Sequence, residues 1–466
     1  MLLLTLFSSK ISTKFILITL LIISSFTAYF MNSYNVVIDS DMIRNTVQTN
    51  IDESMDLFNF KLLIYLLLLG VLPSIFVYKT KIEYGSFKEE TFRKIKTILL
   101  SLLVIIIMIF SFSKFYTSFF REHKPLRYYT NPTYWIYGIG DYISKTFNGG
   151  KIVLQPTGMD AKILPSKDKP KLVIMVVGEA ARADHFSLNG YEKETNPLLK
   201  REKIINLPNI HSCGTSTAHS VPCMFSMYDR DDYSYKKAIR HENVLDVLKH
   251  TNSVEILWRD NNSDSKGVAL RVPFKDFKTP KNNTLCEGEC RDEGMLVGLD
   301  KYIKTREGKD ILVILHQMGN HGPAYYKRYP KEFEKFTPVC ETNQLEECSK
   351  ESINNAYDNA ILYTDYFLSK TINLLKKYEN NYETTMIYMS DHGESLGEHG
   401  IYLHGIPYFM APEAQTHIGA LVWLGKENKK EIDPKKAYTH DNLFHTLLGL
   451  FDVQTEVYDS KMDIFK

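Results

Sequence analysis

The sequence predicts an α-helical membrane region followed by an α/β domain with a central, mostly parallel sheet between helices. Two observations lead to this prediction. Three long apolar runs with very few charges lie in the first quarter of the 466-residue chain. Further along, several short apolar runs each stop at polar residues, a pattern typical of parallel strands covered on both faces.

The three long runs are close to the length that crosses a hydrocarbon core of about 30 Å. They cover about residues 15–31, 62–78 and 98–112. Buried core helices are the alternative, but three such runs so close together favour membrane spans. We predict a transmembrane domain over 1–115, interfacial helices and a linker over 116–170, and a catalytic domain over 171–466.

Charged residues between the runs predict their orientation. The loop over 79–96 is rich in lysine and arginine, whereas 32–60 carries five acidic residues and one arginine. Because basic loops stay on the cytoplasmic side, we expect the chain beyond the third run to lie outside the cell membrane. The formal net charge of +1 gives no reason to expect nucleic-acid binding.

The residues after the third run fit the membrane surface. The stretch over 113–150 interleaves aromatic residues with lysine and arginine, which is typical of short helices in the headgroup layer. An ordinary amphipathic core helix is the alternative. The stretch over 151–170, rich in proline and lysine, is expected to be a linker.

All six cysteines lie beyond the apolar runs, in close pairs. An exported domain favours disulfides within these pairs, and zinc ligation is the alternative, although the spacings are unlike those of zinc fingers. The pairs are Cys213–Cys223, Cys286–Cys290 and Cys340–Cys348.

Polar residues at the ends of the expected strands suggest a metal and phosphate pocket. The runs 172–177, 254–258, 311–315 and 385–389 each lead into such residues, and a helix is expected over 356–378. A single histidine is more often structural, but several charged groups at successive strand ends need partners. Carboxylates beside imidazoles suit a zinc-type ion. The candidates are Glu179, His321, Asp391, His392 and His404.

A nucleophile is expected within HSCGTSTAHSVPC, residues 211–223. A hydroxyl near a metal is activated because coordination lowers its pKa, although capping and turn formation are the default roles of Ser and Thr. The residues alone leave Thr215, Ser216, Thr217 and Ser220 open. Lys266 either neutralises phosphate charge or is a solvated lysine.

Longer motifs resemble a known family. VVGEAARADHFSLNGY, SCGTSTAHSVPCMFS, ILWRDNNSDSKGV, LHQMGNHGPAYYKRYP and YMSDHGESLGEHGIYLHG occur in order from about residue 173 onward. They resemble the lipid A phosphoethanolamine transferases, including the mobile colistin-resistance enzymes, of the alkaline phosphatase/sulfatase superfamily. In the membrane part, MIRNTVQTNIDESMDLF is similar to a periplasmic segment of that family.

The resemblance implies roles for individual residues. It implies zinc ligation by Glu179, Asp391 and His392, and it makes Thr217 the nucleophile, which also binds zinc. It implies one firmly bound zinc, with His321 and His404 available for a second, and three disulfides in the pairs named above. Contacts with the donor phosphate are implied for Asn262, Ser263, Lys266, His321 and His404, with Lys266 and the two histidines in catalytic roles.

The resemblance also implies an activity. Phosphoethanolamine would move from phosphatidylethanolamine through a covalent phosphothreonine to lipid A or another envelope acceptor, with release of diacylglycerol. The protein would be a monomer of the bacterial inner membrane, surrounded by membrane lipids, with its catalytic domain in the periplasm. The alternatives are a phosphoglycerol transferase or sulfatase on the same scaffold, and a non-enzymatic membrane protein with structural zinc.

The sequence departs from the family in three respects. The family usually has five spans, and this chain, with three, is expected to begin near the end of the second. Lys350 stands where many relatives have a histidine, and His219 replaces a common tyrosine. Both changes lie where they can alter acceptor choice.

Overall fold

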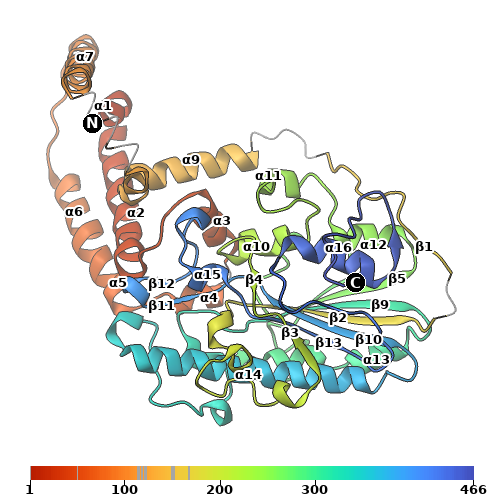
Figure 1. Ribbon diagram of the computed structural model, residues 1–466. Helices are drawn as coiled ribbons and strands as arrows, with labels where there is room; N and C mark the ends of the chain where they lie inside the picture. Colours follow the sequence, from red (N-terminus) through yellow and green to blue (C-terminus); the bar gives the residue numbers. More distant parts are fainter. Residues whose placement is uncertain are drawn as a thin grey trace. The chain divides into compact units, whose positions relative to one another are not determined.

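The computed structural model describes residues 2–49, 51–112, 116, 119, 123–147, 153–165 and 168–465 (Figure 1). It groups into two compact units, Met1–Ser40 with Phe58–Asp141 and Asp41–Leu57 with Tyr142–Lys466. The segment Asp41–Leu57 therefore joins the second unit, although the sequence suggested a membrane domain continuous over 1–115. The boundary at 115 and much of the aromatic stretch over 113–122 lie outside the described residues, so the domain boundaries stay predictions.

The first unit contains the apolar helices. In the described residues, three helical stretches are long and apolar enough to cross a membrane: Ser12–Tyr34, Phe60–Lys79 and Phe87–Ser111. The first is α2 and the third is α7. The second consists of α5 (Phe60–Tyr65), a π-helical turn (Leu66–Val71) and α6 (Leu72–Lys79). A short α1 (Leu2–Phe7) precedes them, and α9 (Thr133–Phe147) follows.

Helix α7 starts well before the expected span over 98–112. Its start is set by a capping box, in which Ser86 accepts from the Glu89 N–H and the Glu89 carboxylate accepts from the Ser86 N–H. The helix therefore includes half of the charged stretch that the sequence suggested as a loop. No residue of α7 is buried, so its apolar side chains are available to lipid.

The second unit is built on a seven-stranded sheet in the order β3-β13-β10-β2-β9-β5-β6. Strands β10, β2, β9, β5 and β6 run parallel, and β13 is antiparallel to both of its neighbours, β10 and β3. This confirms the predicted mostly parallel α/β fold. The strands are β2 (Lys171–Gly178), β3 (Ile204–Asn206), β5 (Val254–Asp260), β6 (Phe274–Asp276), β9 (Asp310–His316), β10 (Glu383–Ser390) and β13 (Ala420–Leu424).

Helices cover both faces of this sheet (Figure 1). Alternate residues of β2, such as Val173 and Met175, join a core with α12 (Val244–His250) and α16 (Asp441–Leu450). The other face is covered by α14 (Lys350–Lys376), the helix expected over 356–378. Because both faces of the sheet are buried, its central strands consist almost entirely of apolar residues, as their sequences indicated.

Short elements complete the second unit. Its helices include α3 (Ser40–Gln48), α4 (Ile51–Asp56), α10 (Thr217–Met224), α11 (Tyr235–Ala238), α13 (Leu299–Lys304) and α15 (Glu413–Thr416). Its short strands are β1 (Lys162–Ile163), β4 (Ile210–His211), β7 (Cys286–Glu287), β8 (Glu289–Cys290), β11 (Ser395–Leu396), β12 (Tyr402–Leu403), β14 (Tyr438–Thr439) and β15 (Val453–Gln454). Disulfides join Cys213–Cys223, Cys286–Cys290 and Cys340–Cys348, in the pairs that the sequence suggests.

Candidate metal centre and nucleophile

The central strands bring three charged groups to one edge of the sheet. Glu179 follows β2, and Asp391 and His392 follow β10, the parallel neighbour of β2. All three side chains are fully buried. Because the carboxyl ends of parallel strands share an edge, the short loops after β2 and β10 hold these side chains together. We call Glu179, Asp391 and His392 the strand-end cluster.

The three side chains of the strand-end cluster hold nitrogen and oxygen acceptor atoms close to one another. His392 Nδ1 lies 2.8 Å from the Gly393 carbonyl oxygen and donates to it, which leaves the lone pair on Nε2. Asp391 Oδ2 lies 3.4 Å from that Nε2, and Glu179 Oε1 lies 3.5 Å from it. Asp391 Oδ2 accepts no hydrogen bond from the described residues.

This arrangement fits a metal ion. One ligand atom from each of Glu179, Asp391 and His392 lies within 4.8 Å of the other two. Burial lowers the pKa of His392 and outweighs the opposing effect of Asp391, so the imidazole is neutral and can ligate. Two buried carboxylates facing a neutral imidazole need a cation, and Glu, Asp and His are ligands that zinc accepts.

Thr217 is the hydroxyl residue that contacts this cluster. It is the first residue of α10, and it is buried. Its Oγ1 donates to Glu179 Oε2 at 3.1 Å and lies 3.3 Å from His392 Nε2. The hydroxyl oxygen therefore stands beside the ligand atoms, where a bound metal would lower its pKa.

Two of the other candidate hydroxyls are engaged in holding the loop. Thr215 Oγ1 donates to the carbonyl of Ile406 at 2.7 Å, and Ser220 Oγ accepts from the Gly214 N–H at 2.9 Å. Among the hydrogen bonds of the described residues, those of Thr217 reach the strand-end cluster, and its role as nucleophile stays a prediction.

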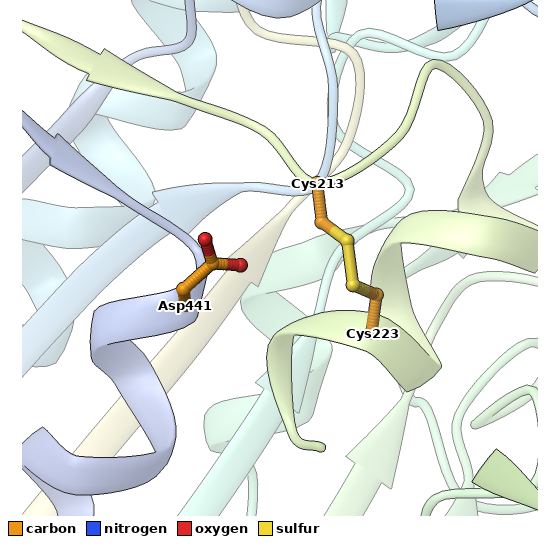
Figure 2. A group of neighbouring side chains, drawn as sticks. All are labelled: Cys213, Cys223 and Asp441. Atoms are coloured by element: carbon orange, nitrogen blue, oxygen red, sulfur yellow. A yellow bond between two sulfur atoms is a disulfide. The ribbon is translucent and has the colours of Figure 1, made fainter. Parts of the chain in front are cut away.

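The loop before Thr217 is tied down from two sides. Figure 2 shows the Cys213–Cys223 disulfide joining this loop to α10, with Asp441 beside it. Since the two sulfurs are bonded to each other, this group offers no thiolate to a metal. His440 accepts from the Cys213 N–H at 3.1 Å and donates to the Ser390 carbonyl at 2.9 Å, with burial lowering its pKa to about 4. The nucleophile loop is thereby fixed to the end of β10.

A second group of side chains flanks the cluster. His404 Nδ1 lies 2.7 Å from Glu394 Oε2, and Tyr325 donates from its hydroxyl to Glu394 Oε1 at 2.7 Å. The His404 ring lies 4.2 Å from that of His392 and 6.0 Å from that of His321, measured between ring centroids. Burial, with the charge of Arg328, holds the pKa of His321 well below its ordinary value. We call His321, Glu394 and His404 the hairpin flank.

The remaining predicted residues differ in how directly they contact the strand-end cluster. Asn262 donates from Nδ2 to Glu179 Oε2 at 2.8 Å, so it touches the strand-end cluster directly. Ser263 bonds to the Asn262 side-chain oxygen, from its N–H at 2.6 Å and its hydroxyl at 2.9 Å. Lys266 is buried, and its Nζ donates to the carbonyl of Gln48 at 3.4 Å. It also lines a cavity of about 460 Å³ together with Asp264 and Arg271.

The structure adds residues that the sequence reasoning missed. Glu394 holds His404, and Tyr325 donates to Glu394, yet neither residue was assigned a role. Glu394 lies three residues after Asp391, so a second carboxylate following a strand-end histidine was a readable signal. Among the departures, His219 lies with its Nδ1 3.7 Å from Asp41 Oδ2, and Lys350 is exposed at the start of α14.

Comparison with known proteins identifies the family of this chain. Residues 171–453 match the family model described as Sulfatase, and residues 1–147 match that of Phosphoethanolamine transferase EptA/EptB. The chain is 47% identical over 468 residues to phosphatidylethanolamine transferase Mcr-2 of Escherichia coli, covering 97% of this chain and 86% of the relative. Mcr-1 of Escherichia coli is 46% identical over 462 residues, with 95% and 84% covered.

One solved structure matches this chain over its whole length. The integral membrane protein lipooligosaccharide phosphoethanolamine transferase A (EptA) from Neisseria meningitidis superposes with a TM-score of 0.93 at 35% identity, covering 100% of this chain and 89% of that one. The α/β domain and its buried cluster define a protein of the alkaline phosphatase/sulfatase superfamily. Within that class, the chain belongs to the phosphoethanolamine transferase family, and it is a membrane protein.

Proposed function

We propose that this protein transfers phosphoethanolamine from phosphatidylethanolamine to lipid A, or to another lipopolysaccharide or envelope acceptor, through a covalent phosphothreonine at Thr217. The contact of Thr217 Oγ1 with both Glu179 and His392 carries this proposal. The donor class follows from the family, whose members Mcr-1 and Mcr-2 are named phosphatidylethanolamine transferases.

Glu179, Asp391 and His392 would hold one zinc ion, with Thr217 as a further ligand. Zinc bound there would supply a Lewis acid that favours the alkoxide form of Thr217 at neutral pH. His404 and Glu394, which group with His392, are the residues that a second ion would use, with His321 nearby.

In the first step, Thr217 Oγ1 forms a bond to the phosphorus of the donor, and the bond from phosphorus to the glycerol oxygen breaks. The proton of the Thr217 hydroxyl is taken up by neutral His321 or His404, and the same histidine then gives it to the departing diacylglycerol oxygen. Before the proton leaves, the hydrogen bond from Thr217 to Glu179 holds the nucleophile oxygen beside the strand-end cluster.

In the second step, an acceptor oxygen attacks the same phosphorus. The bond to Thr217 breaks, and the acceptor proton passes through the histidine that protonated diacylglycerol to Thr217 Oγ1, which restores the hydroxyl. Lys266, Asn262 and Ser263 are proposed to hold phosphoryl oxygens. Asn262 already spans from Glu179 to the Gln317 carbonyl, and Lys266 provides a buried cation.

We further propose that the protein is a multi-pass monomer of the inner membrane, with its catalytic unit in the periplasm. The basic loop over 79–96 and the three disulfides support this orientation. Reporter fusions after Gly85 and at the C-terminus should report opposite compartments, and equal signals would reject the orientation.

The alternatives fit the comparisons less well. A phosphoglycerol transferase or sulfatase would share the fold and the match to the Sulfatase family model, but the EptA/EptB family model and the relatives above point to phosphoethanolamine. A structural zinc protein does not explain a threonine hydroxyl at the ligand atoms.

The test uses the full chain in vesicles that contain labelled phosphatidylethanolamine and lipid A. Wild type should release diacylglycerol and add a phosphoethanolamine increment to the lipid A mass spectrum, and a host that expresses it should tolerate more polymyxin, because surface negative charge falls. Glu179→Ala should do neither. Diacylglycerol release without modified lipid A would keep the donor and reject this acceptor, and no release at all would reject the transferase.

A further inference from the structure

The position of the acidic segment Asp41–Leu57 in the structure was not predicted from its charge pattern. In the sequence it lies between the first and second apolar helices, and it forms α3 and α4. It nevertheless groups with the catalytic unit. Its two ends contact different segments that carry residues of the candidate site.

The first end contacts α10 and its surroundings. Asp41 lies beside His219, two residues after Thr217, and the Arg44 guanidinium lies 4.0 Å from the centre of the Tyr235 ring. Gln48 accepts from Lys266 Nζ through its backbone carbonyl. This end therefore borders the nucleophile helix.

The second end contacts the loop that carries His321. Asp56, the last residue of α4, is buried, and its Oδ2 accepts from Arg328 Nη2 at 2.6 Å. Its Oδ1 accepts from Lys327 Nζ at 2.5 Å, and its backbone carbonyl accepts from Asn343 at 2.6 Å. The carboxylate is thus held in one orientation against two cations.

Arg328 links Asp56 to the candidate site. Its guanidinium is buried, and its Nε donates to the backbone carbonyl of His321 at 2.6 Å. Its Nη1 donates to both oxygens of Glu289, at 2.6 and 2.7 Å. Because the guanidinium is planar and rigid, an anchor on Nη2 fixes the direction of Nε and with it the position of the His321 backbone.

We propose that Asp56 is a positioning residue for transfer, acting through Arg328 to hold His321 beside His404. The inference rests on the proposed function, in which His321 or His404 moves a proton. Asp56 does not touch the strand-end cluster in the described structure, so its loss should leave zinc binding intact. It should displace the His321 imidazole, and a displacement of the order of 1 Å costs up to about 100-fold in rate.

The test compares Asp56→Asn with Lys327→Ala in the full chain. Asp56→Asn keeps the size of the side chain, and Glu289 still neutralises Arg328, so the fold is expected to survive. It should lower kcat about 10- to 100-fold, with zinc content and KM for phosphatidylethanolamine unchanged. Lys327→Ala removes the other cation on Asp56 and should stay within about twofold of wild type. Wild-type kcat in Asp56→Asn would overturn the proposal.

A double-mutant cycle separates positioning from a general structural effect. In a His321→Ala background, adding Asp56→Asn should change kcat by less than about twofold, because the side chain that Asp56 positions is absent. A further drop as large as that seen in the wild-type background would overturn the proposal. If Asp56→Asn melts early, Arg328→Lys replaces it in the cycle, since lysine keeps the charge but lacks the Nε–H. Wild type without any transfer would reject the proposed function itself, whereas an additive cycle rejects only this role.

Discussion

The strand-end cluster and the hairpin flank lie side by side but are held by different means. Glu179, Asp391 and His392 sit in short loops directly after strands, and Asp391 Oδ1 accepts from the N–H groups of Ala180 and His392 at 3.2 and 2.8 Å. The backbone therefore orients these ligands. In the hairpin flank, side chains orient one another, as Glu394 does for His404.

The difference separates two tasks. A metal site needs ligand atoms at fixed positions before the metal arrives, and strand ends buried in a sheet provide them. Proton transfer needs a group whose basicity and direction are tuned by a neighbour, and a histidine held by a carboxylate provides that. Variants in the two parts should therefore fail in different ways.

The largest effect is expected at the boundary of the strand-end cluster. Thr217→Ala should abolish transfer, by at least about 10³-fold, because no covalent intermediate can form. Zinc content should stay near wild type, since Glu179, Asp391 and His392 remain. The measurement pairs diacylglycerol release with zinc per protein. Thr217→Ser, which keeps the hydroxyl, should retain part of the activity, and substantial transfer by Thr217→Ala would move the nucleophile to another residue of the loop.

A smaller effect is expected in the hairpin flank. Glu394→Gln keeps the size of a fully buried side chain but removes the charge that orients His404, so kcat should fall about 10- to 100-fold. Tyr325→Phe removes only the hydroxyl that donates to Glu394, so it should lower kcat less than Glu394→Gln does. Rates from single-turnover labelling distinguish the two variants. Equal zinc content with unchanged rates in Glu394→Gln would show that the hairpin flank is structural.

The same division explains what the sequence could predict. Glu179, Asp391 and His392 each follow a local signal, an apolar strand that stops, and the parallel sheet then brings them together. Glu394 and His404 meet because β11 and β12 pair in register, with Ser395 opposite Leu403, and a short hairpin of this kind leaves no strong pattern. Contacts far apart in the chain are harder still: Asp56 and Arg328 are separated by 272 positions.

Two further points show the limits of local patterns. The choice of Thr217 came from the family resemblance, because four neighbouring hydroxyls look alike until the loop is folded. The early start of α7 had a readable signal in Ser86 and Glu89, yet charge density favoured a loop. The fold class could be predicted because its patterns repeat along many residues. Loop conformations could not, because each depends on a few individual hydrogen bonds.

A moderate effect on stability is expected where the nucleophile loop is tied to α10. The double variant Cys213→Ala/Cys223→Ala removes a bridge with a sequence separation of 10. The chain-entropy relation gives a loss of about 2–3 kcal/mol in free energy of unfolding. Transfer should fall more than in Cys340→Ala/Cys348→Ala, whose bridge spans a similar loop with a sequence separation of 8. Equal activity losses in the two variants would show that the first bridge has no special bearing on Thr217. Melting temperature and transfer rate of the full chain check both points.

The smallest effect concerns an ion pair between the loop after β2 and the turn that joins β11 to β12. Arg182, shortly after β2, donates to Glu398 Oε1 at 2.5 Å, and Glu398 lies in the hairpin between β11 and β12. Burial raises the pKa of Glu398, but Arg182 outweighs it, and the net pKa is lowered. A carboxylate with a lowered folded pKa adds stability above its unfolded pKa of about 4.3, and this is lost as pH falls through the folded pKa.

Glu398→Gln should therefore reduce the free energy of unfolding by about 1 kcal/mol or less at pH 7, because the pair is partly exposed and Asp184 still holds Arg182. The difference from wild type should be full above the unfolded pKa of about 4.3, shrink as the pH falls below it, and vanish once the pH is below the lowered folded pKa, where Glu398 is protonated in both states. Melting curves of both proteins at several pH values check this, with Glu431→Gln as an exposed control that should show no change. A difference that does not depend on pH would mean that Glu398 contributes to stability by packing and not by charge.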